Sequence, residues 1–452
     1  MHGELNVSGG HAHPIEATSG TELRDLQDAL LRRQVRYLWE RSEFYRRKLA
    51  AAAATPDAIG GVADLPGFPF TTKDEIRVSL ESRRPLGDHL AADPRDLVQF
   101  HSSSGTTGRP SYVALTAADL ADWTEVIRRS YWTVGFRPRD RVLQALGMSR
   151  SWVGGLPMVQ GLAALGASVI PAGAEPGTRW LLNVIRDLEP NRLVATPSFA
   201  AYLGEQSEEV LGVPAKDLSV RRIYVGGEPG GGIPPFRAHV EELWGAELRE
   251  VMGGTDLCPV LWAECEDRTG MHFQAADSVF VEIVSLEDQT PLPIEEGTVG
   301  ELVYTHLKRE ATPVLRFRHA DIVEVIGTAC PCGRTSPKIR CFGRTDDMII
   351  VRGVNVHPTA IQDIVLSLRP DTTGAVRVVK ESPLHAVSGP LRVRVERGEG
   401  VRPEDEPDLA RRVERAIHEL CRARASVEIV PPGTFPKPGR EKVSLVEKAY
   451  EG

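Results

Sequence analysis

The sequence predicts an α/β protein with a large multilayer N-terminal domain, built on mainly parallel sheets and a small β layer, and a smaller mobile α+β C-terminal lid domain. Three observations support this prediction. The 452-residue chain is about three times as long as a typical domain. In its middle part, short aliphatic and β-branched runs alternate with helix-compatible segments. After Arg344 the composition changes, and a second α+β pattern continues to the end of the chain.

Composition excludes several classes of protein. With 41% hydrophobic and 26% charged residues, the chain can bury a sizeable core. The net charge is −8, and no long basic run is present, which argues against a nucleic-acid partner. No apolar stretch approaches the roughly 20 residues of a membrane span, and the first residues lack the apolar core of a signal peptide. We therefore expect a cytoplasmic protein without a membrane partner.

The N-terminal region divides into a tail and a helix. Residues 1–20 are rich in Gly, Ser and His and are expected to form a flexible N-terminus. Ser19 and Glu22 have the spacing of a capping box, and apolar residues at helical spacing follow, which predicts a long amphipathic helix. The N-terminal domain is expected to cover residues 21–344 and the lid domain residues 345–452.

Four runs in the middle of the chain predict parallel strands. They cover residues 141–147, 167–173, 192–197 and 222–227, and helix-compatible segments separate them. Each run ends in Gly or Pro followed by small or polar residues. Since α/β sheets bind ligands at the carboxyl ends of their parallel strands, the site should lie along these ends.

The remaining elements predict antiparallel and α+β structure. Residues 277–284 and 300–306 alternate like antiparallel strands and flank an acidic, turn-rich segment. The C-terminal part predicts four strands, with the sequences MIIV, GAVRVVK, LRVRVE and VEIV, and helices near residues 358–369 and 405–425.

A hydroxyl-rich loop between His101 and Pro110 is the most informative segment. Its sequence, HSSSGTTGRP, lets backbone N–H groups and hydroxyls turn inward around two glycines, which suits a phosphate cradle. The spacing is not that of the P-loop, and a plain flexible surface loop is the alternative. The candidate phosphate-binding residues are Ser103, Ser104, Gly105, Thr106, Thr107, Gly108 and Arg109.

Five further motifs follow this loop in order: YVGGEP (224–229), VMGGTD (251–256), LRFRHAD (315–321), GRTDDMIIVRGVNVHP (343–358) and PPGTFPKPGREK (431–442). Together the six motifs resemble the signature of the adenylate-forming ligases, the superfamily of acyl- and aryl-CoA synthetases and firefly luciferase. The sequences GGEP, GELVYT, CGRT and RGVNVHP are most similar to those of the phenylacetate-CoA ligase branch. The resemblance implies that ATP and Mg²⁺ convert a carboxylate into an acyl-adenylate, and that a thiol then attacks the adenylate.

The resemblance also implies residue roles. Asp321 matches the carboxylate that binds the ribose hydroxyls, Arg344 the arginine that follows the ribose and phosphates, and Asp346 the hinge residue of the lid. The alternatives are a turn aspartate for Asp321 and a structural ion pair for Arg344. The family's segments that bind adenine, ribose and the acyl group are matched by Gly226, Gly227, Glu228, Pro229, Met252, Gly253 and Gly254. Thr255 matches a position beside the α-phosphate, and Asp256 matches the family's Mg²⁺ ligand.

Some positions depart from the family pattern. Met252 stands where an aromatic residue commonly stacks on adenine, Asp256 replaces Glu, and Arg109 replaces a lysine. For the catalytic lysine of adenylation we expect Lys442, and Lys437 is the competitor because the segment carries no glycine before Lys442.

Cysteine spacing predicts a metal site. Cys265 and His272 form a C-x6-H pair, and Cys330 and Cys332 form a C-x-C pair. Three thiolates and one imidazole suit a closed, structural Zn²⁺. Cysteines without metal in a turn are the alternative, and Cys258 is a substitute ligand. Cys341 and Cys421 are expected to be ordinary core residues.

The predicted acyl pocket has aromatic walls with small residues between them, which favours an aryl or arylacetic acid over a long chain. Its residues are Trp152, Gly154, Gly155, Ser198, Phe199, Tyr202 and Gly226. His101 and His357 are candidate polar contacts to a ring substituent, with a structural role as the alternative. We expect coenzyme A to accept the acyl group; a carrier-protein phosphopantetheine and a non-catalytic nucleotide-binding protein are the alternatives, and a homodimer is considered.

Overall fold

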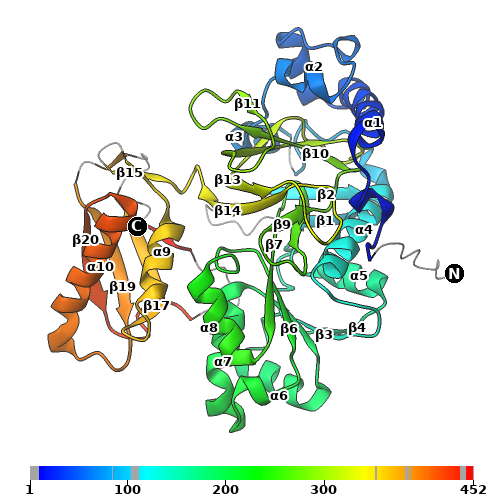
Figure 1. The fold of residues 1–452 in the computed structure, drawn as a ribbon. Helices are drawn as coiled ribbons and strands as arrows, with labels where there is room; N and C mark the ends of the chain where they lie inside the picture. Colours follow the sequence, from blue (N-terminus) through cyan, green and yellow to red (C-terminus); the bar gives the residue numbers. More distant parts are fainter. Residues whose placement is uncertain are drawn as a thin grey trace.

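The computed structural model describes residues 10–83, 85–102, 111–351, 354–381, 386–387, 389–437 and 444–450 (Figure 1). Over these ranges the main feature is a 12-stranded mixed sheet with the order β11-β10-β12-β13-β14-β9-β8-β7-β6-β5-β3-β4. A two-stranded ribbon lies apart from it, and two smaller sheets belong to the C-terminal part. The predicted fold class is confirmed.

One half of the large sheet is parallel, as the four aliphatic runs predict. β3 pairs with β4 and β5, β5 with β6, and β6 with β7, all in parallel. Glycines in the left-handed region end three of the connecting helices, at Gly166, Gly212 and Gly245. The elements are β3 (Arg141–Gln144), α5 (Leu156–Leu165), β4 (Ser168–Pro171), α6 (Thr178–Leu188), β5 (Arg192–Ala195), α7 (Pro197–Leu211), β6 (Arg222–Val225), α8 (Pro234–Trp244) and β7 (Glu247–Gly254).

The other half is antiparallel and begins earlier than the sequence suggests. The alternation of residues predicts it after Asp277, whereas β7 already pairs in antiparallel fashion with β8. β7 therefore joins the two halves into one continuous sheet. The strands are β8 (Cys258–Glu264), β9 (Met271–Phe273), β10 (Val279–Val284), β11 (Pro291–Leu292), β12 (Val299–His306), β13 (Phe317–Gly327) and β14 (Lys338–Arg344).

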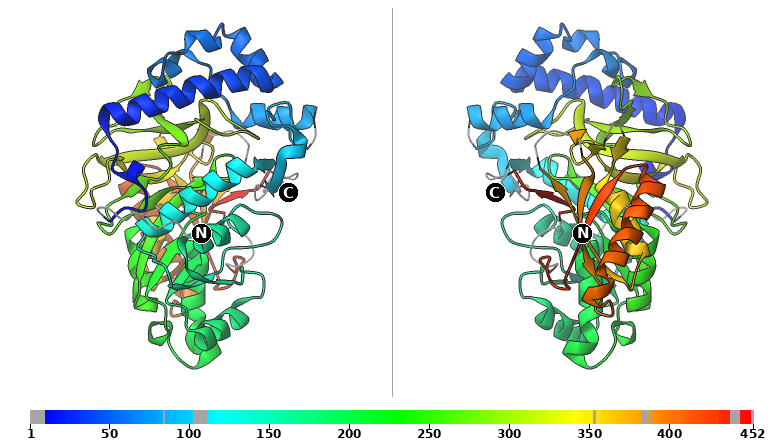
Figure 2. Two further views of the ribbon diagram at one scale, coloured as in Figure 1. Left: turned by 90° about the vertical axis from the view of Figure 1, so that its right-hand side faces the viewer. Right: turned by 90° about the vertical axis from the view of Figure 1, so that its left-hand side faces the viewer.

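The N-terminal helices cover the antiparallel half. Figure 2 shows α1 lying across these strands, and its apolar face packs against Leu307 and Leu315. The predicted helix is present, but within the described chain the Ser19 side chain makes no cap hydrogen bond, so the expected capping box does not form. The elements are α1 (Gly20–Arg41), α2 (Glu43–Ala51), α3 (Lys73–Ser82), the ribbon of β1 (Leu97–Ser102) and β2 (Tyr112–Thr116), and α4 (Ala117–Thr133).

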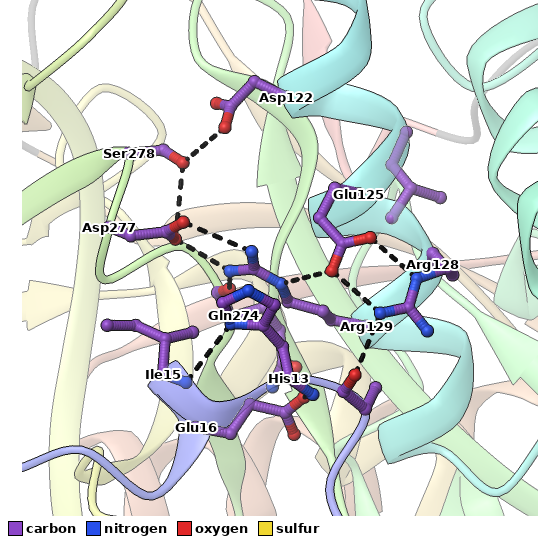
Figure 3. Close-up of polar contacts among 12 residues, drawn as sticks. His13, Ile15, Glu16, Asp122, Glu125, Arg128, Arg129, Gln274, Asp277 and Ser278 are labelled. Carbon is purple, nitrogen blue, oxygen red and sulfur yellow. Dashed lines mark hydrogen bonds and ion pairs between the residues drawn. The ribbon is translucent and has the colours of Figure 1, made fainter. Parts of the chain in front are cut away.

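Residues 10–19 are packed, whereas the sequence places them in a flexible N-terminus. They include the short 3₁₀ helix Pro14–Glu16 and lie against α4. Figure 3 shows the polar contacts that hold them: the Arg128 guanidinium donates to the Ala12 carbonyl, and buried Arg129 pairs with Glu125 and Asp277. This network joins the N-terminal segment to α4 and to the turn before β10.

The C-terminal part forms a smaller α+β domain with its own core, as Figures 1 and 2 show. It packs beside α7 and α8 through Leu366, which joins the core of the parallel half, and through the Arg369–Glu205 ion pair. Its proposed start at residue 345 stays a prediction. Its elements are β15 (Ile349–Val351), β16 (Val354–Val356), α9 (Pro358–Ser367), β17 (Thr372–Lys380), β18 (Ala386–Val387), β19 (Leu391–Arg397), α10 (Glu406–Cys421), β20 (Ala425–Val430) and β21 (Val446–Lys448).

Among the described residues, no helix combines the length and the hydropathy that crossing a membrane requires.

Candidate active site

The register of two antiparallel strands brings three predicted residues together. Asp321 on β13 lies directly opposite Arg344, the last residue of β14. Arg344 Nη1 donates to Asp321 Oδ1 at 2.8 Å, and its Nε and Nη2 donate to the two Asp346 oxygens at 2.8 and 2.9 Å. The chain thus places a buried carboxylate, a guanidinium and the predicted hinge residue in one network.

His319 completes this network, and the sequence reading does not select it. Its Nδ1 donates to Asp321 Oδ2 at 2.6 Å, and its backbone carbonyl accepts from Arg344. The two residues meet at an irregular part of β13, where Ala320 between them has a φ of 75° and the pairing with β12 shifts register. Regular strand alternation does not describe this contact, so the LRFRHAD motif alone does not single out His319.

The electrostatics of the pair favour charged groups. Burial raises the pKa of the Asp321 carboxyl, but the neighbouring His319 and Arg344 outweigh burial, so its pKa lies below the usual value. Burial lowers the pKa of Arg344, but the carboxylates of Asp321, Asp346 and Asp347 together outweigh burial, so its pKa lies above the usual value. Asp321 is therefore an anionic acceptor at neutral pH, as binding two hydroxyl donors requires.

The end of β7 packs onto the same network. A Cβ added at Gly254 would lie 2.2 Å from His319 Nε2, so only glycine allows the imidazole ring to approach this strand. Thr255 and Asp256 follow in a turn that the Leu257 N–H closes on the Gly254 carbonyl at 3.1 Å. The predicted nucleotide residues of β7 and β13 thus lie close together.

The segment after β6 lies against β7. A Cβ at Gly226 would meet Val251 at 2.7 Å, and Gly227 has a φ of 92°, which favours glycine. Glu228, which precedes Pro229, accepts a hydrogen bond from the Ser198 N–H at 2.8 Å. This bond joins the predicted adenine and acyl segments at the start of α7.

A half-buried carboxyl supports the next turn of this segment. Glu250 on β7 accepts from the Gly232 N–H at 2.7 Å. Burial, together with the nearby Glu264 charge, raises the pKa of Glu250 to about 7. The loop that follows β6 is therefore held by a group that titrates near neutral pH.

The predicted pocket residues lie on the loops that follow β3 and β6 and on helix α7. The Trp152 ring lies against Gly154, where a Cβ would come within 2.5 Å of it, and a Cβ at Gly155 would lie 2.9 Å from the Gly147 carbonyl oxygen. Phe199 on α7 is 2% exposed and belongs to the core of the parallel half. Tyr202, one turn later, is partly exposed and lies beneath the Lys437 ammonium at 5.7 Å.

Several predicted residues lie outside the described ranges. These are Lys442 and the phosphate-loop residues Ser103, Ser104, Gly105, Thr106, Thr107, Gly108 and Arg109. β1 and β2 flank that loop. Both ring nitrogens of His101 at the end of β1 are engaged, with the Ser151 carbonyl and the Gln99 side chain, which favours a structural role.

The four predicted metal ligands converge. Cys265 Sγ lies 3.7 Å from Cys330 Sγ, Cys332 Sγ lies 3.5 Å from His272 Nε2, and all four ligand atoms lie within 4.8 Å of one another. A tetrahedral zinc ion with usual bond lengths would separate two sulfurs by about 3.8 Å and a sulfur and a nitrogen by about 3.6 Å. The donor set and its spacing therefore fit Zn²⁺. Among the described residues, Cys258 is not part of this group.

The residues around the four predicted ligands favour the binding of a cation. His272 Nδ1 bonds to the Ser336 carbonyl at 3.0 Å, which directs Nε2 toward the cysteines. Hydrogen bonding from Cys265, and then from His272, holds the pKa of the Cys332 thiol well below its usual value. β14 runs from this cluster to Arg344, so one strand connects the cluster with the nucleotide residues.

Comparison with known proteins agrees with this arrangement. The profile of the AMP-binding enzyme family matches residues 16–306, and that of the AMP-binding enzyme C-terminal domain matches residues 353–448. The chain belongs to the AMP-binding enzyme family.

Within that family the chain is close to the phenylacetate-CoA ligases. It is 35% identical over 440 residues to the phenylacetate-coenzyme A ligase of Thermus thermophilus, covering 94% of this chain and 96% of the relative. Among solved structures it resembles 2-hydroxyisobutyryl-CoA ligase in the postadenylation state, with a TM-score of 0.89, 25% identity, and coverage of 99% and 94%. The same ligase in the thioesterification state, with CoA bound, gives a TM-score of 0.70 at 27% identity, with coverage of 96% and 91%.

Proposed function

We propose that this chain is an AMP-forming aromatic acid–CoA ligase. In the first half-reaction the carboxylate attacks the α-phosphorus of ATP, forming an acyl-adenylate and releasing pyrophosphate. In the second, the CoA sulfur attacks the acyl carbon and releases AMP. The observation that carries the proposal is the similarity to a phenylacetate-coenzyme A ligase along almost the whole of both chains.

Each described residue has a role that suits its chemistry. Asp321 accepts the ribose hydroxyls, and Arg344 and His319 hold its two oxygens in place. Thr255 lies beside the α-phosphate. Asp256 supplies a hard oxygen ligand for Mg²⁺, which when bound offsets the negative charge of the triphosphate.

CoA is the favoured acceptor. The T. thermophilus relative and the solved structures are ligases of coenzyme A. A carrier-protein acceptor has no comparable support. The ion pair of buried Asp321 with half-buried Arg344 is intact, which argues against the non-catalytic alternative.

The acid is proposed to be aryl or arylacetic. The Trp152 ring packs on Gly154 in the loop after β3, and Tyr202 offers a partly exposed ring one turn after Ser198 on α7, so the predicted pocket segments carry two aromatic rings. A planar substrate ring stacks on such rings better than a flexible chain does.

A structural zinc ion is part of the proposal. Cys265, His272, Cys330 and Cys332 would hold it with no position open for substrate, and it would contribute stability rather than chemistry.

The proposed activity is tested by pyrophosphate release with ATP and Mg²⁺ over benzoic, aminobenzoic, hydroxybenzoic and phenylacetic acids, with and without CoA. We expect release with at least one of these acids and a marked increase when CoA is added. Release that CoA does not stimulate would favour a carrier protein. Absence of release over the whole panel would contradict the aromatic-acid proposal.

The same assay separates the two candidate lysines. Lys442→Ala should lower adenylation by at least about 100-fold, because a positive charge at the forming adenylate is lost, while thioester formation from supplied acyl-adenylate is retained. Lys437→Ala is the matched control and should have a smaller effect. A larger loss of adenylation in Lys437→Ala would reverse the assignment.

A further inference from the structure

A buried tryptophan in α4 contacts the turn that carries Asp256. The Trp123 indole N–H donates to the Leu257 carbonyl at 2.9 Å, and the residue is 2% exposed. Leu257 is the last residue of the turn Gly254–Leu257 and closes it with its own N–H. One hydrogen bond therefore ties a core side chain to the turn that holds Thr255 and Asp256.

This tie fixes the far end of the turn. The near end is fixed by β7, because Gly254 pairs with Cys258 of β8 and packs against the His319 ring, where a Cβ would lie 2.2 Å from Nε2. Thr255 and Asp256 lie between these two ends, so their orientation depends on where the Leu257 carbonyl is held. The Leu257 carbonyl is an anchor point immediately after Asp256.

Two further groups fix the indole ring. The His101 imidazole stacks on it with centroids 5.7 Å apart and planes at 30°. The Arg309 guanidinium carbon lies 4.6 Å from the ring centroid. His101 belongs to β1, and Arg309 follows β12, so the ring is held between elements that are distant in sequence.

The helix that carries Trp123 is itself locked in place. Near its start, Asp119 accepts the backbone N–H groups of Glu310 and Ala311 at 2.8 and 2.9 Å. Around Trp123, Asp122 accepts from the Ser278 hydroxyl, and Arg129 pairs with Asp277 in the turn before β10 (Figure 3). The helix turn bearing Trp123 is thus attached on both sides.

We propose that Trp123 is a positioning residue for adenylation, because its indole N–H orients the turn that presents Thr255 and Asp256 to the metal–triphosphate group. The inference rests on the proposed function. The inference also predicts that a change at Trp123 affects the first half-reaction more than the second, since Mg²⁺ and the triphosphate take part in the first and are absent from the second.

Trp123→Phe tests the inference, because phenylalanine keeps an aromatic face for His101 and Arg309 but loses the N–H donor. The matched control is Trp244→Phe: Trp244 is also fully buried and donates to the Ala200 carbonyl at 2.8 Å, but it lies in the core of the parallel half. Both variants lose one buried hydrogen bond of the same kind.

We expect Trp123→Phe to lower kcat/KM for MgATP in adenylation by about tenfold, the equivalent of one lost hydrogen bond, and to raise the Mg²⁺ concentration for half-maximal rate. Thioester formation from a supplied acyl-adenylate and CoA should change little. Trp244→Phe should lower thermal stability to a similar extent without favouring either half-reaction. An equal loss in both half-reactions, or a Trp123→Phe profile like that of Trp244→Phe, would show that Trp123 serves packing alone.

Calorimetric titration of ATP at several Mg²⁺ concentrations, without acid, separates this inference from the proposed function. The Mg²⁺-dependent part of the ATP affinity should fall in Trp123→Phe and persist in Trp244→Phe. Because this binding needs no carboxylic acid, it decides the role of Trp123 even if every acid in the panel fails. An unchanged Mg²⁺ dependence would overturn the inference.

Discussion

At the level of single residues, His319 shows how a neighbour positions the carboxylate that is proposed to bind the nucleotide. It occupies the space that Gly254 leaves free and donates to one oxygen of Asp321, while Arg344 donates to the other. Asp321 could be predicted from its motif, because LRFRHAD resembles the family pattern, although the residue lies within β13 and not at a strand end. The contribution of His319 depends on a contact with a glycine 65 positions earlier in the chain, at Gly254, and such contacts are set by strand register.

Replacing His319 should weaken nucleotide binding. His319→Ala removes the donor to Asp321 Oδ2 and leaves space beside Gly254, so we expect KM for ATP to rise by about five- to tenfold. His319→Asn offers an amide N–H in place of Nδ1–H and should recover most of the affinity. Steady-state kinetics over an ATP series measures both effects. Equal impairment of the two variants, or an unchanged KM for ATP in His319→Ala, would contradict the role.

At the level of elements, the C-x-C turn connects the predicted metal site to the N-terminal segment. The His11 ring bonds to the Cys332 carbonyl at 2.9 Å, and Arg334 pairs with Glu16 at 2.7 Å in a buried position. The metal ligands could be predicted because cysteine chemistry is visible in the sequence. The packing of residues 10–19 could not, since a Gly-, Ser- and His-rich segment has no periodic pattern and its order comes entirely from its partners.

Removal of zinc should therefore loosen both the C-x-C turn and the N-terminal segment, residues 10–19. We expect chelation to lower the melting temperature by on the order of 5 °C and to speed amide hydrogen exchange in residues 11–18. Differential scanning fluorimetry and exchange mass spectrometry measure these effects. Cys332→Ser should reproduce them, and Cys421→Ser, outside the cluster, should not. Protein purified without chelator that contains no zinc by elemental analysis would rule out the site.

At the level of the whole molecule, the sequence predicts the parts better than their arrangement. The aliphatic runs correctly predict β3 to β6, because strands of a helix-covered parallel sheet need continuous apolar residues; β3, β5 and β6 are largely buried, and β4 is the partly exposed edge strand. They do not reveal that β7 joins the parallel and antiparallel halves. Nor do they place the C-terminal domain, because its contacts with α7 and α8 are few and partly polar.

The structure of this chain is more similar to one state of a related enzyme than to another. The TM-score with 2-hydroxyisobutyryl-CoA ligase falls from 0.89 in the postadenylation state to 0.70 in the thioesterification state, although the relative is the same protein. In this chain, Arg369 of the C-terminal domain pairs with Glu205 on α7 at 2.9 Å, and His239 on α8 contacts the same carboxylate at 3.0 Å.

Breaking this contact should shift the balance between the half-reactions. Arg369→Ala removes a pair that is partly exposed, so we expect adenylation to slow by only about two- to fivefold, with thioester formation from supplied acyl-adenylate unchanged or faster. Arg412→Ala is the matched control, because Arg412 pairs with Asp371 at 2.7 Å entirely within the C-terminal domain. Single-turnover rates of the two steps provide the measurement. If Arg369→Ala slows both steps equally, or if Arg412→Ala has the same effect, the contact does not select the position of the C-terminal domain, and that position must depend on Leu366 and the bound nucleotide instead.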